Sequence, residues 1–129
     1  MAAYAAPQSY QQHAVMTAPP GRLVVMLYEG ACRFLRRASL AMQHGDVAKT
    51  NAALQRGEAI INELLVTLDH EKGGEIADSL RDLYLFCGRY LNEARLEKDH
   101  EKIEAVAGLL DELRDAFAQI DPDPNGTAV

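Results

Sequence analysis

The chain has 129 residues, of which 48% are hydrophobic and 25% charged, a composition typical of one globular domain with its own core. Its formal net charge is -6, with 13 Lys and Arg against 19 Asp and Glu, so it lacks the overall basic field that proteins use to bind nucleic acid. No run approaches the ~18 apolar residues of a membrane-spanning helix, and the N-terminus lacks the pattern of a signal peptide. We therefore expect no nucleic-acid partner, no direct membrane insertion and no cleaved leader.

The first segment, residues 1–19, is rich in Ala, Gln and Pro and carries almost no charge. Such a segment buries too little apolar surface to offset the entropy lost on ordering, so we predict a flexible N-terminal segment. It still contains Tyr4, Tyr10, Val15 and Met16, which would dock on a groove if the rest of the chain offered one.

The first helix is predicted from about Pro20 to His44, because apolar residues recur there at helical spacing. Gly45 is expected to end this helix in the left-handed conformation, and Asp46 to cap the next one. The run Leu23–Leu27 places five successive apolar side chains around the whole circumference of the helix. A core-facing helix needs apolar residues at only about three positions in seven, so this helix carries more apolar surface than one neighbouring layer can cover.

The second helix is predicted over 47–70 and the third over 75–98, with a break between them at Lys72–Gly74. Both helices again carry a wide apolar arc, and the run Leu83–Cys87 repeats the surplus of the first helix. We expect no capping Ser or Asp at the start of the third helix, where Glu75 supplies only a first-turn acid.

The fourth helix is predicted over 100–120, with Asp99 as its N-cap, and its apolar stripe is narrower. The sequence contains no alternating pattern of a strand. We therefore predict an all-α fold, an antiparallel up-down four-helix bundle over residues 20–120. Residues 1–19 form a flexible or loosely docked N-terminal segment in this interpretation, and residues 121–129 a flexible tail.

Four glycines stand inside the predicted helices: Gly30, Gly57, Gly88 and Gly108. Each would cost about 1 kcal/mol relative to alanine in an exposed helix, so each needs a reason. Close approach of neighbouring helices is the favoured reason for each. The alternative is that Gly30 and Gly57, which adjoin the surplus apolar rows, leave room for the side chains of a partner.

No pattern of catalytic or metal-binding residues emerges from the chain. Ferritin-like bundles use two Glu-x-x-His pairs, whereas this chain has one match, at Glu97 and His100 near a helix end. Glu29 has no paired base or nucleophile in a recognisable motif. Cys32 and Cys87 lack the spacing of a metal or redox site and are interpreted as buried free thiols, with a bridge between them left open. We expect no enzyme, no metal and no cofactor.

Surplus apolar surface on three of the four helices instead favours a binding function. A contiguous apolar strip on the surface of a small protein commonly marks an interaction site. A groove between helices accepts an amphipathic helix of another chain.

Several short motifs resemble those of the flagellin-export chaperone family, FliS. They occur in collinear order from Tyr10 to Phe117. The motifs are Tyr10, Val15-x-Thr17-Ala18, Leu23-x-x-Met26-Leu27-Tyr28-Glu29-Gly30-Ala31, Gly73-Gly74-Glu75-Ile76-Ala77, Leu80-x-x-Leu83-Tyr84 and Leu91-x-x-Ala94. The chain departs from the family pattern at Pro19, where a capping Ser is usual, and at Phe117, where a Trp is common.

The resemblance implies a cytoplasmic chaperone that binds the C-terminal segment of flagellin, prevents its premature polymerisation and assists its delivery to the flagellar type III export apparatus. It implies that the segment containing Tyr10 covers part of the binding surface when no client is present. The cytoplasmic domain of the export gate is a further partner in this interpretation.

The predicted flagellin-binding residues combine this lid with apolar side chains of the first three helices, some of which are expected to be bundle core. They are Tyr10, Leu23, Leu27, Tyr28, Ile61, Leu64, Leu68, Leu80 and Tyr84. The alternative hypothesis is a self-associating helical module in which a second copy, at least as a weak homodimer, buries the apolar surplus. A metal-dependent bundle enzyme is a third hypothesis, which bound iron or manganese would reveal.

Overall fold

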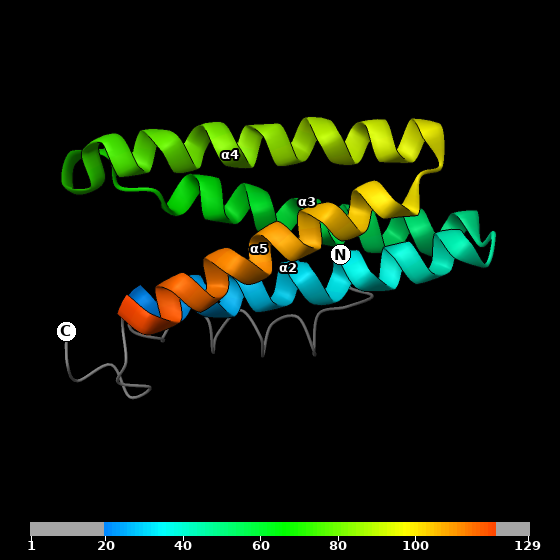
Figure 1. The fold of residues 1–129 in the computed structure, drawn as a ribbon, viewed down its shortest axis with the longest axis horizontal. Helices are drawn as coiled ribbons and strands as arrows, with labels where there is room; N and C mark the ends of the chain where they lie inside the picture. The colour runs from blue at the N-terminus through cyan, green and yellow to red at the C-terminus, as the bar shows by residue number, and fades with distance from the viewer. Residues whose placement is uncertain (1–19, 121–129) are drawn as a thin grey trace, which may run out of the picture.

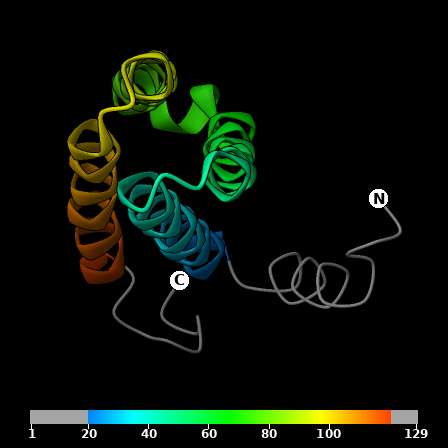
Figure 2. The same ribbon diagram turned by 90° about the vertical axis from the view of Figure 1, so that its right-hand side faces the viewer.

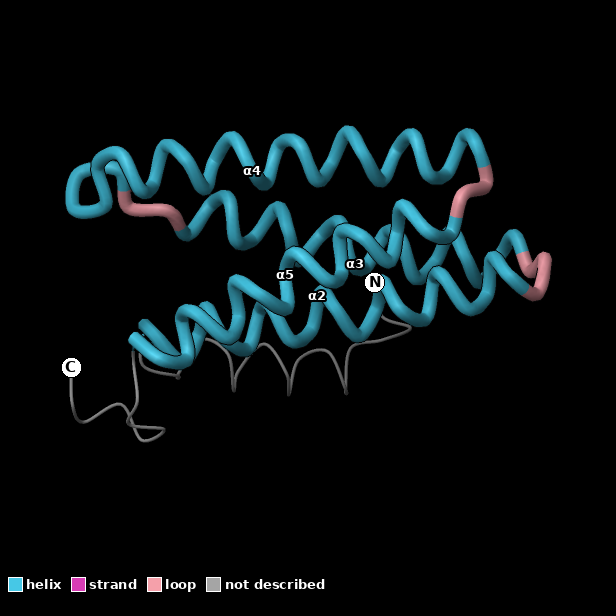
Figure 3. Tube along the Cα trace, viewed as in Figure 1, coloured by secondary structure: helices cyan, strands magenta, loops and turns pink. Residues whose placement is uncertain are grey.

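The computed structural model describes residues 20–120, and the predictions for residues 1–19 and 121–129, including the lid, lie outside this range. Four helices occupy the described residues: α2 (Pro20–Gln43), α3 (Val47–Thr67), α4 (His70–Glu97) and α5 (His100–Ile120). Short turns join them, and the described range contains no strand (Figures 1 and 3).

The four helices surround a common axis in the order α2, α3, α4, α5, as the end view shows (Figure 2). Successive helices run antiparallel because only two or three residues connect each to the next. α2 packs closely against both α3 and α5, whereas α4 stands farther out and completes the bundle (Figures 1 and 2). The prediction of an antiparallel four-helix bundle is confirmed.

Two of the three turns between helices are stabilised by the cap residues predicted from the sequence. Gly45 ends α2 with a φ of 73°, a left-handed conformation that costs glycine nothing. The Asp46 carboxylate accepts a hydrogen bond of 3.0 Å from the backbone N–H of Lys49 and so caps α3. Asp99 similarly accepts a bond of 3.0 Å from the backbone N–H of Glu101 at the start of α5.

The turn between α3 and α4 differs from the prediction. α3 ends at Thr67, earlier than expected, and α4 begins at His70 with Asp69 as its N-cap. The expectation that no Asp caps this start is therefore wrong. The predicted break does exist as a kink, because Gly74 adopts a φ of 50° and a ψ of -124° inside α4.

The core lies along the bundle axis and contains the apolar rows of all four helices. Its largest fully buried side chains are Tyr28, Leu35, Leu54, Leu64, Leu91, Ile103, Leu110, Val106, Cys87 and Ser39. The apolar run Leu83–Cys87 of α4 lies partly outside this core, because Leu85 is 43% and Phe86 is 42% exposed. The same run that supplies Tyr84 to the core thus also presents apolar surface to solvent.

The interior glycines divide into two pairs. A Cβ on Gly57 would lie 2.8 Å from Leu35 Cδ2, and one on Gly30 would lie 3.2 Å from Ile60 Cδ1, so both permit close contact between α2 and α3. The alternative that they leave room for a partner's side chains is wrong, because these helices fill the space themselves. A Cβ on Gly88 or Gly108 would meet no atom within 4 Å, and close packing explains neither.

Both cysteines are buried and free, as interpreted from the sequence, with no bridge between them. Burial raises the pKa of the Cys32 thiol to about 12 and that of the Cys87 thiol to about 11. Within residues 20–120, no helix has the length and apolar character needed to cross a bilayer.

Candidate functional site

An apolar groove of about 310 Å³ lies at the end of the bundle that carries the α3–α4 turn. All four helices contribute to it, because the start of α2, the end of α5 and the α3–α4 turn all lie at this end (Figure 1). We call it the end groove. It is lined by Val24, Leu64, Thr67, Leu68, Asp69, Lys72, Gly73, Ile76, Ala77, Leu80, Tyr84 and Phe117.

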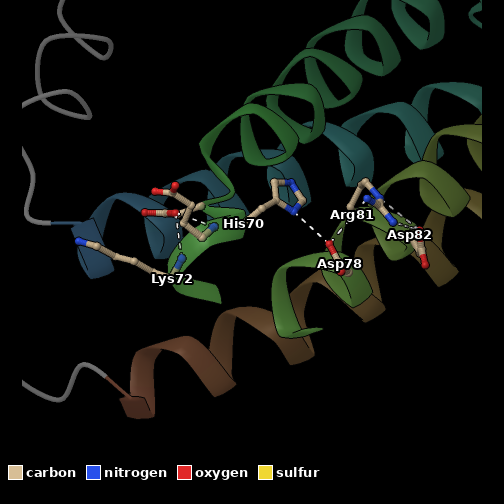
Figure 4. Close-up of polar contacts among 7 residues, drawn as sticks. His70, Lys72, Asp78, Arg81 and Asp82 are labelled. Atoms are coloured by element: carbon tan, nitrogen blue, oxygen red, sulfur yellow. Dashed lines mark hydrogen bonds and ion pairs between the residues drawn. The ribbon is translucent and has the colours of Figure 1, made fainter. Parts of the chain in front are cut away.

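Polar contacts hold the first turn of α4 in place beside the end groove (Figure 4). The Asp69 carboxylate accepts hydrogen bonds of 3.1 Å from the backbone N–H groups of Glu71 and Lys72. Beyond the kink, Asp78 lies 3.1 Å from His70 Nδ1, so the two sides of Gly74 are tied together. Apolar side chains that follow the kink line the end groove.

Two of those side chains form the α4 wall of the groove. Ile76 is 70% exposed, so most of its aliphatic side chain faces solvent beside the groove. Leu80, one helical turn later, is half-buried and also packs against the core. A ligand with an apolar face would cover both residues and gain about 25 cal/mol for each Å² of apolar surface removed from water.

The floor of the groove rests on a cluster of aromatic rings. Tyr84 lines the groove, while Tyr28 lies beneath it with none of its surface exposed. Their hydroxyls share a hydrogen bond across the bundle diagonal, between helices that are not adjacent. The ring of Phe117 packs on Tyr28 with a centroid distance of 5.6 Å. Burial raises the pKa of both tyrosines, so both hydroxyls stay protonated further into the alkaline range than an exposed tyrosine would.

The predicted site residues separate into groove and core positions. Leu64, Leu68, Leu80 and Tyr84 line the end groove. Leu27, Tyr28 and Ile61 are buried members of the core, and Leu23 is half-buried against it. Tyr10 lies outside the described residues. The structure thus brings together four of the predicted residues in one groove.

Sequence reasoning did not assign Val24, Ile76 and Phe117 to the site, although all three line the groove. Val24 lies within the apolar run Leu23–Leu27, Ile76 belongs to one of the quoted motifs, and Phe117 stands where a Trp is common in the family. The available signal was the position of these residues near helix ends, because an apolar side chain at the end of a bundle has fewer neighbours to bury it.

The acidic residue of the Tyr28-Glu29-Gly30 motif has a structural partner. Glu29 Oε2 accepts hydrogen bonds of 3.1 Å from Arg114 Nε and 3.0 Å from Arg114 Nη2, which join α2 to α5. Among the described residues, no three His, Cys, Asp or Glu side chains cluster closely enough to hold a metal ion. The end groove therefore offers apolar contact and shape to a ligand.

The family of the chain follows from its match to known proteins. A family model described as "Flagellar protein FliS" matches residues 2–124, which include every element of the end groove. The chain belongs to the FliS family.

Curated relatives support the same assignment over most of the chain. The flagellar secretion chaperone FliS of Salmonella typhimurium is 45% identical over 112 residues, which cover 86% of this chain and 83% of the relative. The protein of the same name from Campylobacter jejuni is 36% identical, covering 87% of this chain and 88% of the relative. That of Bacillus subtilis is 35% identical, with coverage of 86% and 82%.

Proposed function

We propose that this chain, a chaperone of flagellar export by its family, binds the C-terminal segment of flagellin and uses the end groove as part of the binding surface. The proposal places the chain in the cytoplasm, where it keeps flagellin from polymerising before export. It then delivers its client to the type III export apparatus, with the cytoplasmic domain of the export gate as a second partner.

The observation that carries this proposal is the open apolar wall at Ile76 and Leu80. A large aliphatic residue that is 70% exposed beside a groove buries little of its surface within the bundle itself. An amphipathic helix of another chain would cover it, in the manner of helix-in-groove recognition. A segment that orders only on binding gives up part of the contact energy, which suits a carrier that must release its client.

The test measures binding of the flagellin C-terminal segment of the same organism by isothermal titration calorimetry. In the variant Ile76→Asp, a charge would be buried against the client, and the apolar contact, worth about 1.5–3 kcal/mol, would be lost. We expect at least a tenfold weaker Kd, since about 1.4 kcal/mol corresponds to a factor of ten.

The matched control is Leu96→Asp on the same helix. Leu96 is 75% exposed and lies at the other end of α4, outside the end groove. Both variants should keep the wild-type melting temperature because neither side chain is in the core. If Ile76→Asp binds as tightly as Leu96→Asp, the end groove is not the client site.

The lid is tested by removing residues 1–17. If Tyr10 and its neighbours compete with the client for the groove, deletion strengthens binding of the flagellin segment. Unchanged affinity would count against a lid. The alternative, a self-associating module, predicts a dimer in sedimentation that ignores the flagellin segment.

A further inference from the structure

A second groove lies between the second half of α2 and the first half of α3. These halves are at the end of the bundle opposite the α3–α4 turn (Figure 1). The groove measures about 400 Å³, within the ~300–1,000 Å³ range of ligand pockets. We call it the arginine groove. It is lined by Phe34, Arg37, Leu40, Ala41, His44, Lys49, Ala52, Ala53 and Arg56.

The arginine groove combines an apolar floor with a basic rim. Three guanidinium groups surround the ring of Phe34, with their Cζ atoms 5.3 Å (Arg37), 5.6 Å (Arg56) and 6.0 Å (Arg33) from its centroid. The groove also contains Leu40, which is 55% exposed, and this side chain would anchor an apolar group of a ligand.

This concentration of positive charge is unusual in a chain whose net charge is -6. Four other arginines of the bundle form ion pairs. These pairs are Arg36–Asp111, Arg81–Asp78, Arg81–Asp82, Arg95–Glu58, Arg114–Glu29 and Arg114–Asp115. Arg33 and Arg37, one helical turn apart, have no acidic partner among residues 20–120, although like charges at this spacing repel each other. An acidic ligand would relieve that repulsion.

We propose that the arginine groove is a docking site for an acidic amphipathic segment of a partner protein. Carboxylates of the segment would pair with Arg33, Arg37 and Lys49, while an aliphatic side chain packs on Leu40 between the two helices. A peptide fits better than a nucleic acid, because the groove lining is largely apolar and an amphipathic segment brings apolar side chains to it as well as carboxylates. The site is separate from the end groove and does not depend on the function proposed for it.

The experiment uses a fluorescent amphipathic peptide of about a dozen residues, with leucines at i, i+3 and i+7 and glutamates elsewhere. A control peptide carries glutamine in place of every glutamate. Fluorescence anisotropy measures binding to the full chain at low and at physiological salt. We expect the glutamate peptide to bind at least tenfold more tightly than the glutamine peptide, and this difference to shrink as salt screens the charges.

The double variant Arg33→Glu with Arg37→Glu should bind the glutamate peptide at least tenfold more weakly than the wild-type chain does. Arg89→Glu is the matched control, because Arg89 is also exposed on a helix without an acidic partner among the described residues. Leu40→Asp is a second, independent variant that should weaken binding without disturbing the core. None of the three should change the affinity for the flagellin segment, and Ile76→Asp should not change the affinity for the glutamate peptide.

Three results would overturn the proposal. The first is equal binding of the glutamate and glutamine peptides, and the second is equal binding of the glutamate peptide by the double variant and by Arg89→Glu. The third comes from a single-stranded oligouridylate of similar length. If it binds more tightly than the glutamate peptide and the double variant abolishes this binding, the basic rim recognises nucleic acid instead.

Discussion

The hydrogen bond between Tyr28 and Tyr84 offers the sharpest test of the structure, because each hydroxyl is the other's partner in a buried position. The variant Tyr84→Phe keeps the ring but leaves the Tyr28 hydroxyl without a partner. An unsatisfied buried hydroxyl costs about 1–3 kcal/mol. Tyr28→Phe should cost a similar amount, because Tyr84 is only 3% exposed and its hydroxyl would also lose its partner. The double variant replaces both partners and should be less harmful than the sum of the two single changes.

The free energy of unfolding is measured by urea denaturation followed by far-UV circular dichroism. For a domain of this size, 1 kcal/mol shifts the melting temperature by about 4–8 °C, so a 2 kcal/mol loss in Tyr84→Phe lowers it by roughly 8–16 °C. The decisive quantity is the coupling energy of the double-mutant cycle. If the losses of the two single variants simply add, the hydroxyls do not depend on each other and the described contact between α2 and α4 is wrong.

Two further predictions concern glycine packing and the buried thiols. Gly57→Ala should destabilise the fold by roughly 1 kcal/mol, because overpacking against Leu35 outweighs the gain in helix propensity. Gly88→Ala should instead stabilise the fold by up to about 1 kcal/mol, because the added methyl group meets no other atom. Equal melting temperatures of the two variants would refute the assigned packing. Burial raises the pKa of the Cys87 thiol in the folded protein to about 11. As the pH rises from about 9 toward 11, Cys87 therefore loses its proton in the unfolded chain but keeps it in the folded protein. The free energy of unfolding then falls by up to about 1.4 kcal/mol per pH unit. Cys32, whose pKa is raised to about 12, adds to this loss, and Cys87→Ala should flatten the pH dependence measured by urea denaturation; an unchanged slope would contradict the assignment.

Several features of the chain followed from its sequence alone. The spacing of apolar residues predicts four helices, and Gly45, Asp46 and Asp99 mark their ends. These signals are readable because they act between residues no more than about four positions apart. The one turn that was misplaced contains Asp69, whose capping role was masked by a helical pattern that continues into the turn.

Only the tertiary structure decided which apolar residues form the core and which form a groove. Helical spacing shows that Tyr28 and Leu80 face inward, but burial depends on how far each neighbouring helix extends beyond that position. Tyr28 is therefore enclosed, while Leu80 and Ile76 border a groove at the end of the bundle. The pairing of Tyr28 with Tyr84, 56 positions away, likewise depends on the angles at which all four helices pack, and these angles are a property of the assembled bundle.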